Sequence, residues 1–415
     1  MKRNESCILI LSIIIPLYLF ILSIIISQLL GFMVLRKIDE KGLSSAISFD
    51  RDNATYYYLL GRFYQYDIYQ INMEKAKKYY FESLKRNPLQ GGCWLDLANI
   101  YKTQGQILQA GETLKRAVAL NANNPQIIWE AGLFYLNNNN IKDALQNFKQ
   151  FIILNPGAQQ TVYDLLYKLP VNSDDIINVL LPYNYSYHKN YLLYLISTKR
   201  INDAKNVWKN LYKQNVEDEL ILKYTDFLIS EHYYEEAKEI WDKFISAKFQ
   251  KSENENASEI WNNSFELKML RGGFDWKINE AKGVDIYIDN DIHIHGKRSL
   301  GIDFNGTENL GITLASQVVM VKPGAAYRLK ANIKTNKITT TNGIYFNITG
   351  HDCKELNVNS EVVTGTNFWK ELLIDFKVPN TCNALTIMIK RDRSQKLDNK
   401  ISGSVWIDQI ILTQK

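Results

Sequence analysis

The chain has 415 residues, which is enough for two or three domains at roughly 100–200 residues each. A hydrophobic fraction of 46% with 22% charged residues is ordinary for a globular protein and excludes a wholly disordered chain. The 49 Lys and Arg residues exceed the 44 Asp and Glu residues by only 5. This surplus is spread along the chain without a basic stripe, so the sequence does not predict nucleic-acid binding.

The N-terminal segment is apolar, and no charged side chain occurs between Glu5 and Arg36. It is longer than the roughly 20 residues that cross a bilayer, and it lacks the shorter core and cleavage site of a signal peptide. We expect a tail at residues 1–6, a transmembrane helix at 7–35 and a juxtamembrane linker at 36–50. Basic residues flank both ends of the helix, so charge leaves the orientation open. The short N-terminus favours a single-pass inner-membrane protein whose C-terminal part lies outside the cytoplasm.

A pattern of small and aromatic residues repeats after residue 50. The small residues Gly61, Ala98 and Gly132 are 37 and 34 positions apart, and each is followed three residues later by a tyrosine. The first interval is longer because the first copy carries about three extra residues near 68–73. This pattern resembles the tetratricopeptide repeat, whose period is 34 residues. Small residues at these positions would let the two helices of each pair approach closely.

Weaker copies of the repeat follow. Leu195 and Leu228 begin the same Leu-Ile-Ser motif 33 residues apart, and each motif is followed by an alanine and then by Trp208 or Trp241. The segment from 156 to 189 is degenerate. We predict an α-solenoid of five to six helical pairs over residues 51–250, folding as one stack because each pair buries its apolar face on its neighbours.

The resemblance to tetratricopeptide repeats implies a concave groove that binds a protein partner. The positions expected to face this groove are Tyr58, Arg62, Asn99, Lys102, Trp129 and Leu133. For Trp129 the alternative is packing between helices. The Asn/Lys set with which some family members clamp a C-terminal carboxylate is incomplete, which argues against a chaperone-tail binder.

The pattern changes after Gln250. Residues 251–257 are polar and are predicted to be a linker, and eight short alternating runs separated by turn residues follow in residues 258–415. These runs predict an antiparallel β-sandwich or jelly roll. Their sequences are GVDIYID, KRSLGIDFNG, SQVVMV, YRLKANIKT, GIYFNITG, FWKELLIDFKVP, ALTIMIKRD and SVWIDQIIL.

The order of motifs in this domain resembles jelly-roll carbohydrate-binding modules. Asn-Ser-Phe-Glu266 opens the domain, a Lys-Pro-Gly turn precedes Tyr327, and Val-Trp-Ile-Asp408 closes it. The resemblance implies a structural Ca²⁺ held by Glu266 and Asp408, since oxygen ligands from both ends of the chain would tie the sandwich together. The alternative is that both are solvated edge carboxylates. No other cofactor is expected.

A glycan-binding site would need an exposed aromatic ring against which a sugar stacks. Trp276, in the glycine-rich segment GGFDW, and Trp369, at the start of a strand, are the candidates. The alternative is that these rings belong to the core, because large aromatic side chains bury about 150–250 Å² each. Cys353 and Cys382 share this domain and are able to pair if it faces an oxidising compartment.

The sequence contains no nucleophile elbow, phosphate-binding loop, zinc-protease motif or dinucleotide fingerprint. His293 and His295 would share a strand face, but no third metal ligand is evident. Sequence alone does not place the acidic residues Glu361, Glu371 and Asp375 across a cleft, and most of them are expected on outward strand positions. We therefore predict a protein that is not an enzyme and has no catalytic residues.

Taken together, the anchor, the repeats and the sandwich resemble membrane-anchored tetratricopeptide proteins encoded in bacterial exopolysaccharide and exosortase-type loci. The resemblance implies a scaffold that recruits protein partners during cell-envelope or exopolysaccharide assembly and export. The alternative is a glycan-binding or adhesion protein of the cell envelope, in which the repeats act as a stalk.

Overall fold

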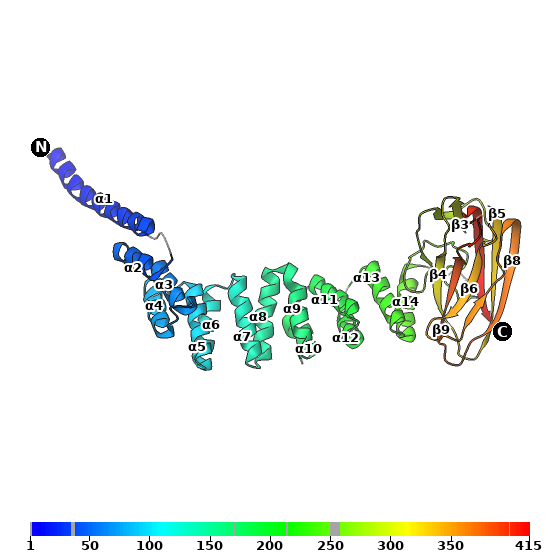
Figure 1. The fold of residues 1–415 in the computed structure, drawn as a ribbon, viewed down its shortest axis with the longest axis horizontal. Helices are drawn as coiled ribbons and strands as arrows, with labels where there is room; N and C mark the ends of the chain where they lie inside the picture. Colours follow the sequence, from blue (N-terminus) through cyan, green and yellow to red (C-terminus); the bar gives the residue numbers. More distant parts are fainter. Residues whose placement is uncertain (1, 35–37, 170, 213–214, 250–257, 398) are drawn as a thin grey trace. The chain divides into compact units, whose positions relative to one another are not determined.

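The computed structural model describes residues 2–34, 38–169, 171–212, 215–249, 258–397 and 399–415. The chain divides into two compact units, Met1–Tyr191 and Leu192–Lys415. Helices form the first part of the chain and strands form the last, as Figure 1 shows. The predicted helical array followed by an antiparallel β-sandwich is confirmed.

The N-terminal helix α1 (Lys2–Val34) continues through Pro16 without a break. Its stretch Ile14–Val34 is long and apolar enough to cross a membrane. Large side chains along it are open to solvent, with Phe20 63% and Ile26 49% exposed. A continuous apolar surface of this kind is stable in a lipid environment and unfavourable in water.

A second helix, α2 (Glu40–Phe49), lies within residues 36–50, which were predicted as a linker. The side chain of Asp39 caps it by accepting a hydrogen bond from the Gly42 N–H at 2.8 Å. Leu43 and Ala46 are fully buried, and Leu43 belongs to the core of the first helix pair. The linker prediction is wrong for this helix, because two apolar residues one turn apart are too few to show a helical period in the sequence.

Five helix pairs follow within the described residues. They are α3 (Ala54–Tyr66) and α4 (Met73–Arg86), α5 (Gly91–Thr103) and α6 (Ile107–Leu120), α7 (Pro125–Asn137) and α8 (Ile141–Leu154), α11 (Tyr185–Ser197) and α12 (Ile201–Leu211), and α13 (Asp218–Ser230) and α14 (Tyr234–Lys248). The small residues allow close packing as predicted. A Cβ atom at Gly61 would lie 2.5 Å from the Tyr80 ring, and one at Gly132 would lie 2.5 Å from the Phe148 ring.

The degenerate segment after α8 forms short helical pieces. They are a 3₁₀ turn η1 (Pro156–Ala158), α9 (Gln159–Tyr167), α10 (Ser173–Asp175) and a π-helical turn η2 (Ile176–Leu180). Ile176, Ile177 and Leu180 are buried, so this irregular segment still contributes apolar side chains to the array.

The C-terminal part is a sandwich of two five-stranded antiparallel sheets. One sheet has the order β1 (Lys277–Ile278), β4 (Ile312–Met320), β9 (Ala384–Arg391), β6 (Tyr345–Gly350) and β7 (Asn357–Asn359). The other has the order β2 (Val284–Asp289), β3 (Ser299–Asn305), β10 (Ser402–Gln414), β5 (Ala326–Ile338) and β8 (Gly365–Lys377). We call these sheets A and B.

Each of the eight predicted strands is present, and β1 and β7 are the two that the sequence did not predict. They have two and three residues, too few to show alternation. In β8 the alternation is clear: Leu372, Ile374 and Phe376 are buried in the core between the sheets, whereas Leu373 and Asp375 face outward.

The last helix pair packs against the sandwich within the second unit. Asp226 of α13 pairs with Lys277 of β1 at 2.7 Å. Trp241 of α14 is 2% exposed, and its ring meets that of Trp261 at a centroid distance of 5.9 Å. The predicted linker 251–257 lies outside the described residues. The residues on either side of it nevertheless join the helix pair to the sandwich directly.

Candidate functional site

Three of the four predicted groove residues of the first two helix pairs gather around a buried acid. Asp96 of α5 is only 7% exposed, and its carboxylate accepts hydrogen bonds from the hydroxyls of Tyr58 at 3.0 Å and Tyr66 at 2.9 Å. The Nε of Arg62 lies 3.4 Å from the same carboxylate. The side chain of Asn99 interacts with the Tyr66 hydroxyl. We call these five residues the Asp96 cluster.

The cluster fixes the position of an arginine that remains open to solvent. The Arg62 side chain is 51% exposed, and its guanidinium lies 5.8 Å from the Tyr58 ring centroid and 5.4 Å from that of Tyr66. Burial raises the pKa of the Asp96 carboxyl, and the hydrogen bonds and Arg62 oppose this rise. Burial beside Asp96 also raises the pKa of both tyrosines, so they remain hydroxyl donors.

Sequence reasoning missed Asp96, although a signal was present. The residue stands between Leu95 and Leu97 on a helix face that is otherwise buried, where an acid is rarely found unless it is paired. Its partners come from α3, 30 to 38 residues earlier in the chain, so only the packed structure identifies them.

The remaining predicted groove residues do not join the Asp96 cluster. Lys102 is exposed on α5. Trp129 and Leu133 are half-buried on α7, and the Trp129 ring packs against Phe148 at 5.3 Å and Phe151 at 4.9 Å. Trp129 therefore packs between helices, which was the alternative to a role at the groove surface.

Trp276 is not available as a glycan platform, and that prediction is wrong. The side chain is fully buried, and its ring packs against Phe265 at a centroid distance of 5.6 Å. Gly273, with a φ of +60°, turns the chain so that Phe274 and Trp276 both point inward. At the other candidate position Trp369 is half-buried, and its neighbour Phe368 is 92% exposed.

A different aromatic group lies on the outer face of sheet B. Tyr287 of β2 and Trp406 of β10 both stand beside Gly301 of β3 in the strand register. The Tyr287 ring packs directly over Gly301, which has no side chain. A Cβ atom at Gly301 would lie 2.6 Å from that ring. The Trp406 indole is nearly buried and donates to Asp289 at 2.8 Å.

Polar side chains border this aromatic group. Asp285 and Asp303 face each other in register, and Ser404 lies opposite Asp303 on the next strand. One oxygen of Asp303 is buried without a hydrogen-bond partner. Burial and Asp303 together raise the pKa of Tyr287 to about 12. Of this surface, only the half-buried ring of Tyr287 could stack against a ligand.

The predicted calcium residues both hold one loop. The Glu266 carboxylate accepts from the backbone N–H groups of residues 297 and 298 at 2.7 and 2.9 Å. The Asp408 carboxylate accepts from those of residues 294 and 295 at 2.9 and 2.8 Å. Acids from opposite ends of the domain therefore fix the β2–β3 loop. Asp408 is fully buried, so the expectation of a solvated edge carboxylate is wrong for it.

Asp408 partly fits a cation site. Its second oxygen is buried without a hydrogen-bond partner, and burial raises the pKa of this carboxyl. A cation would satisfy such an oxygen. Among the residues that the structure describes, no group of three or more His, Cys, Asp or Glu side chains is placed to hold a metal. Calcium here would therefore need backbone carbonyls and water to complete its six to eight oxygen ligands.

The other acidic residues considered for catalysis are ion-paired on the outer surface of the sandwich. Arg328 binds Asp375 through two contacts of 2.7 Å, Lys330 pairs with Glu371, and Lys370 with Glu361 at 2.9 Å. Glu371 and Asp375 occupy outward positions of β8, as the sequence predicted, whereas Glu361 lies in the segment between β7 and β8.

Cys353 and Cys382 form a disulfide with a Cα–Cα distance of 5.3 Å, within the usual range of about 4.4–6.8 Å. The bond joins the loop after β6 to the residues just before β9. The same loop carries His351, whose Nδ1 lies 3.0 Å from the Thr386 hydroxyl oxygen. The His351 ring also lies 5.9 Å from Tyr234 and 6.3 Å from His232 of the last helix pair. The disulfide therefore braces a loop that contacts the helices.

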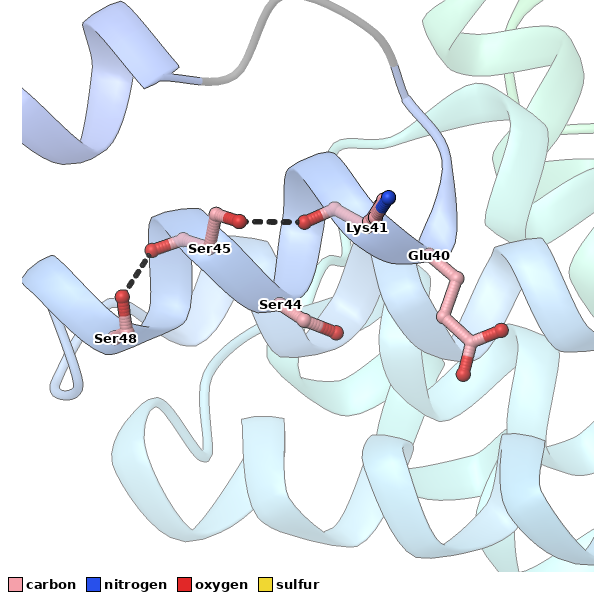
Figure 2. Close-up of a pocket in the computed structure, with 5 residues that line it drawn as sticks. All are labelled: Glu40, Lys41, Ser44, Ser45 and Ser48. Atoms are coloured by element: carbon pink, nitrogen blue, oxygen red, sulfur yellow. Dashed lines mark hydrogen bonds between the residues drawn. The ribbon is translucent and has the colours of Figure 1, made fainter.

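Two hollows in the helical region do not form convincing ligand sites. About 620 Å³ of space lies over the polar face of α2, and Figure 2 shows that the hydroxyls of Ser45 and Ser48 there donate to carbonyls of their own helix. About 720 Å³ lies between α12, α13 and α14. Of its aromatic residues, Trp208 and Tyr224 stack at 4.3 Å and are nearly buried, whereas Tyr212 is 43% exposed.

Comparisons with known proteins give no family for the chain. No known family model matches it, and neither does any curated protein. Among solved structures it is similar to the enzymatically active domain of bacteriophage CBA120 tailspike protein 4, with 15% identity and a TM-score of 0.27 over 38% of this chain. That similarity spans only 22% of the tailspike chain.

Two further solved structures are similar to shares of the chain of about the same size. TmCBM61 in complex with β-1,4-galactotriose has 17% identity and a TM-score of 0.28, covering 38% of this chain and 99% of that chain. MamA has 14% identity and a TM-score of 0.26, covering 42% of this chain and 84% of that chain. At these TM-scores the similarities assign no function to the protein.

Proposed function

We propose that the protein is a non-enzymatic, membrane-anchored scaffold that recruits a protein partner at the Asp96 cluster. The observation that carries this proposal is a half-exposed arginine held by a buried acid and two tyrosines. Burying a charge costs free energy, and apolar packing would stabilise a helix pair at lower cost. The cluster instead orients the guanidinium, whose remaining N–H groups are available to a partner.

The test removes the exposed charges and leaves the buried acid in place. The full-length protein would be crosslinked in its own membranes, and the partners would be compared between wild type and an Arg62→Ala, Lys102→Ala variant. We expect loss of a crosslinked partner together with a lower melting temperature, because the buried Asp96 loses its paired charge. Lys102→Ala alone leaves that pair in place, so it should weaken the crosslink without changing the melting temperature. Arg328→Ala removes an exposed arginine on the sandwich and is the matched control. The proposal would be overturned if the Arg62→Ala, Lys102→Ala variant kept the partner and Arg328→Ala lost it.

Placement of the C-terminal part outside the cytoplasm is part of the same proposal. The disulfide supports it, because such bonds persist in oxidising compartments and are rare in the cytosol. Added protease should digest residues 38–415 in spheroplasts without lysis. A role in envelope or exopolysaccharide assembly follows from the resemblance of the architecture, and deleting the protein should then reduce surface polysaccharide.

A second candidate function is glycan binding on the outer face of sheet B. Tyr287 supports it, because a half-exposed ring stands there beside acidic and hydroxyl side chains that suit sugar hydroxyls. The full-length protein in detergent would be titrated with the host's envelope polysaccharide. Tyr287→Ala should abolish binding, and Phe368→Ala, which removes a more exposed ring on β8, should not. Equal binding by both variants would exclude this site.

A further inference from the structure

The loop between α3 and α4 presents an unusual run of exposed apolar residues. Ile68 is 83% exposed, Tyr69 92% and Ile71 56%. These residues belong to the insertion that lengthens the first repeat, so the packing of the repeats does not require them. Three large apolar side chains exposed to water within four residues are unfavourable. Such a patch marks a surface that contacts another molecule or a membrane.

The loop is held in one conformation by its own hydrogen bonds. The Asp67 side chain accepts from the Tyr69 N–H at 3.0 Å, and the Asp67 carbonyl accepts from the Gln70 N–H at 3.0 Å. At the other end, the Asn72 N–H donates to the Tyr64 carbonyl at 2.8 Å. The exposed side chains are therefore presented by an ordered turn.

The position of the loop along the chain indicates what covers it. Tyr64, which bonds to the end of the loop, also donates its hydroxyl to the carboxylate of Glu40 at the start of α2. Only residues 35–39 separate α2 from the end of α1 at Val34. The chain from Val34 to Glu40 spans at most about 20 Å, so the start of α2 lies near the end of the apolar helix. The hydrogen bonds of Tyr64 join the end of the loop to the start of α2 and so place the loop on this side of the first repeat.

We propose that residues 68–71 insert into the interfacial region of the membrane that α1 crosses. The proposal rests on the proposed membrane anchor. Tyrosine is favoured at the level of the lipid headgroups, and isoleucine gains free energy by leaving water for the acyl boundary. The exposed Lys78 on the following helix carries a positive charge that anionic headgroups would attract. Insertion would hold the first repeat at a fixed angle to the bilayer.

The test places an environment-sensitive fluorophore on the loop of the full-length protein in liposomes of phosphatidylcholine and phosphatidylglycerol. Tyr69→Cys would be labelled in a Cys7→Ser background that retains the disulfide and the buried Cys93. Leu89→Cys is the matched control, since Leu89 is 66% exposed in the turn between α4 and α5. We expect blue-shifted emission at position 69, with quenching by nitroxide lipid and protection from iodide. Position 89 should show the reverse.

A further variant separates this proposal from the anchor. Adding Ile68→Asn and Ile71→Asn should abolish the blue shift at position 69 while the protein stays in the carbonate-washed membrane. If the wild-type protein stays in the membrane but its label at 69 is quenched by iodide as strongly as the label at 89, the insertion proposal is wrong. Release of the wild-type protein by carbonate would instead overturn the membrane anchor.

Discussion

Asp226 of α13 accepts a hydrogen bond from the backbone N–H of Gly273 at 2.9 Å, and this bond joins the last helix pair to the first residues of the sandwich. The same oxygen pairs with Lys277. A side chain at position 273 would collide with the Trp241 ring, so this position requires glycine. The helix pair and the sandwich therefore share one interface built from backbone, charge and aromatic contacts.

Asp226→Ala should lower the free energy of unfolding of the second unit by about 1–2 kcal/mol, because a charge-assisted hydrogen bond contributes about 1.5–3 kcal/mol and this site is partly exposed. Lys277→Ala should cost only about 0.2–1 kcal/mol, the usual contribution of an exposed ion pair. Denaturant unfolding of the detergent-solubilised protein measures both. Asp375→Ala, which breaks an exposed ion pair elsewhere, is the control. If Asp226→Ala and Asp375→Ala lowered the free energy of unfolding by the same amount, the hydrogen bond to Gly273 would have no role of its own.

Acidification should loosen the contact between the helix pair and the sandwich at His351. Burial and the nearby His232 and Lys277 lower the pKa of His351, while Asp352 opposes them. An unfolded histidine titrates near 6.5, so below that pH the unfolded chain binds more protons, and this contact loses stability as pH falls. The hydrogen-exchange protection factors of residues 229–234, corrected for the pH dependence of the intrinsic exchange rate, should be lower at pH 5.5 than at pH 7.5, two values on either side of the histidine pKa of about 6.5.

His351→Gln keeps a side chain that can hydrogen-bond but does not titrate in this range, so the corrected protection factors of residues 229–234 should not depend on pH in this variant. The matched control is His188→Gln, since burial also lowers the pKa of His188, but that residue lies in α11. The control variant should retain the pH dependence. If the dependence persists in His351→Gln, another group is responsible.

Loss of the disulfide should destabilise the sandwich. Cys353 and Cys382 are 29 residues apart, and closing a loop of that length stabilises the folded state by about 3–4 kcal/mol in the chain-entropy account. A Cys353→Ser, Cys382→Ser variant should show a lower melting temperature that a reducing agent does not change. The wild-type melting temperature should fall on reduction toward that of the variant. A wild-type melting temperature that is insensitive to full reduction would refute this prediction.

Calcium at Asp408 would stabilise the native state by mass action, by about 2.7 kcal/mol when its concentration is a hundred times the dissociation constant. Chelation should then lower the melting temperature of the protein, and Asp408→Asn should remove that sensitivity. The Asn side chain still accepts hydrogen bonds from the loop N–H groups. The variant therefore removes the ion without removing the contacts that hold the loop. Asp291→Asn, which changes an exposed acid of the β2–β3 loop, is the control. A melting temperature that chelator leaves unchanged would show that Glu266 and Asp408 serve the loop alone.

Much of the architecture was predictable from local patterns. Three patterns each report the requirements of a single local unit. The apolar N-terminal segment reports one helix, the small residues Gly61 and Gly132 report helix pairs, and the period-2 alternation of β8 reports one strand. Such requirements act between residues close in sequence or one repeat apart, so they remain visible without the fold. The short elements α2, β1 and β7 were missed because they contain too few residues for a period to appear.

The sites depended on the tertiary structure. Asp96 acquires its role from tyrosines and an arginine on another helix, and Asp408 from the loop that begins after residue 289. Trp276 is buried because Gly273 turns the chain inward, which composition does not show. The sequence by itself determined which segments form helices and strands and that the N-terminal helix is apolar, because these properties follow from local periodicity and composition. Only the folded chain decided which polar groups are buried and with which partners, because burial and pairing depend on contacts between distant segments.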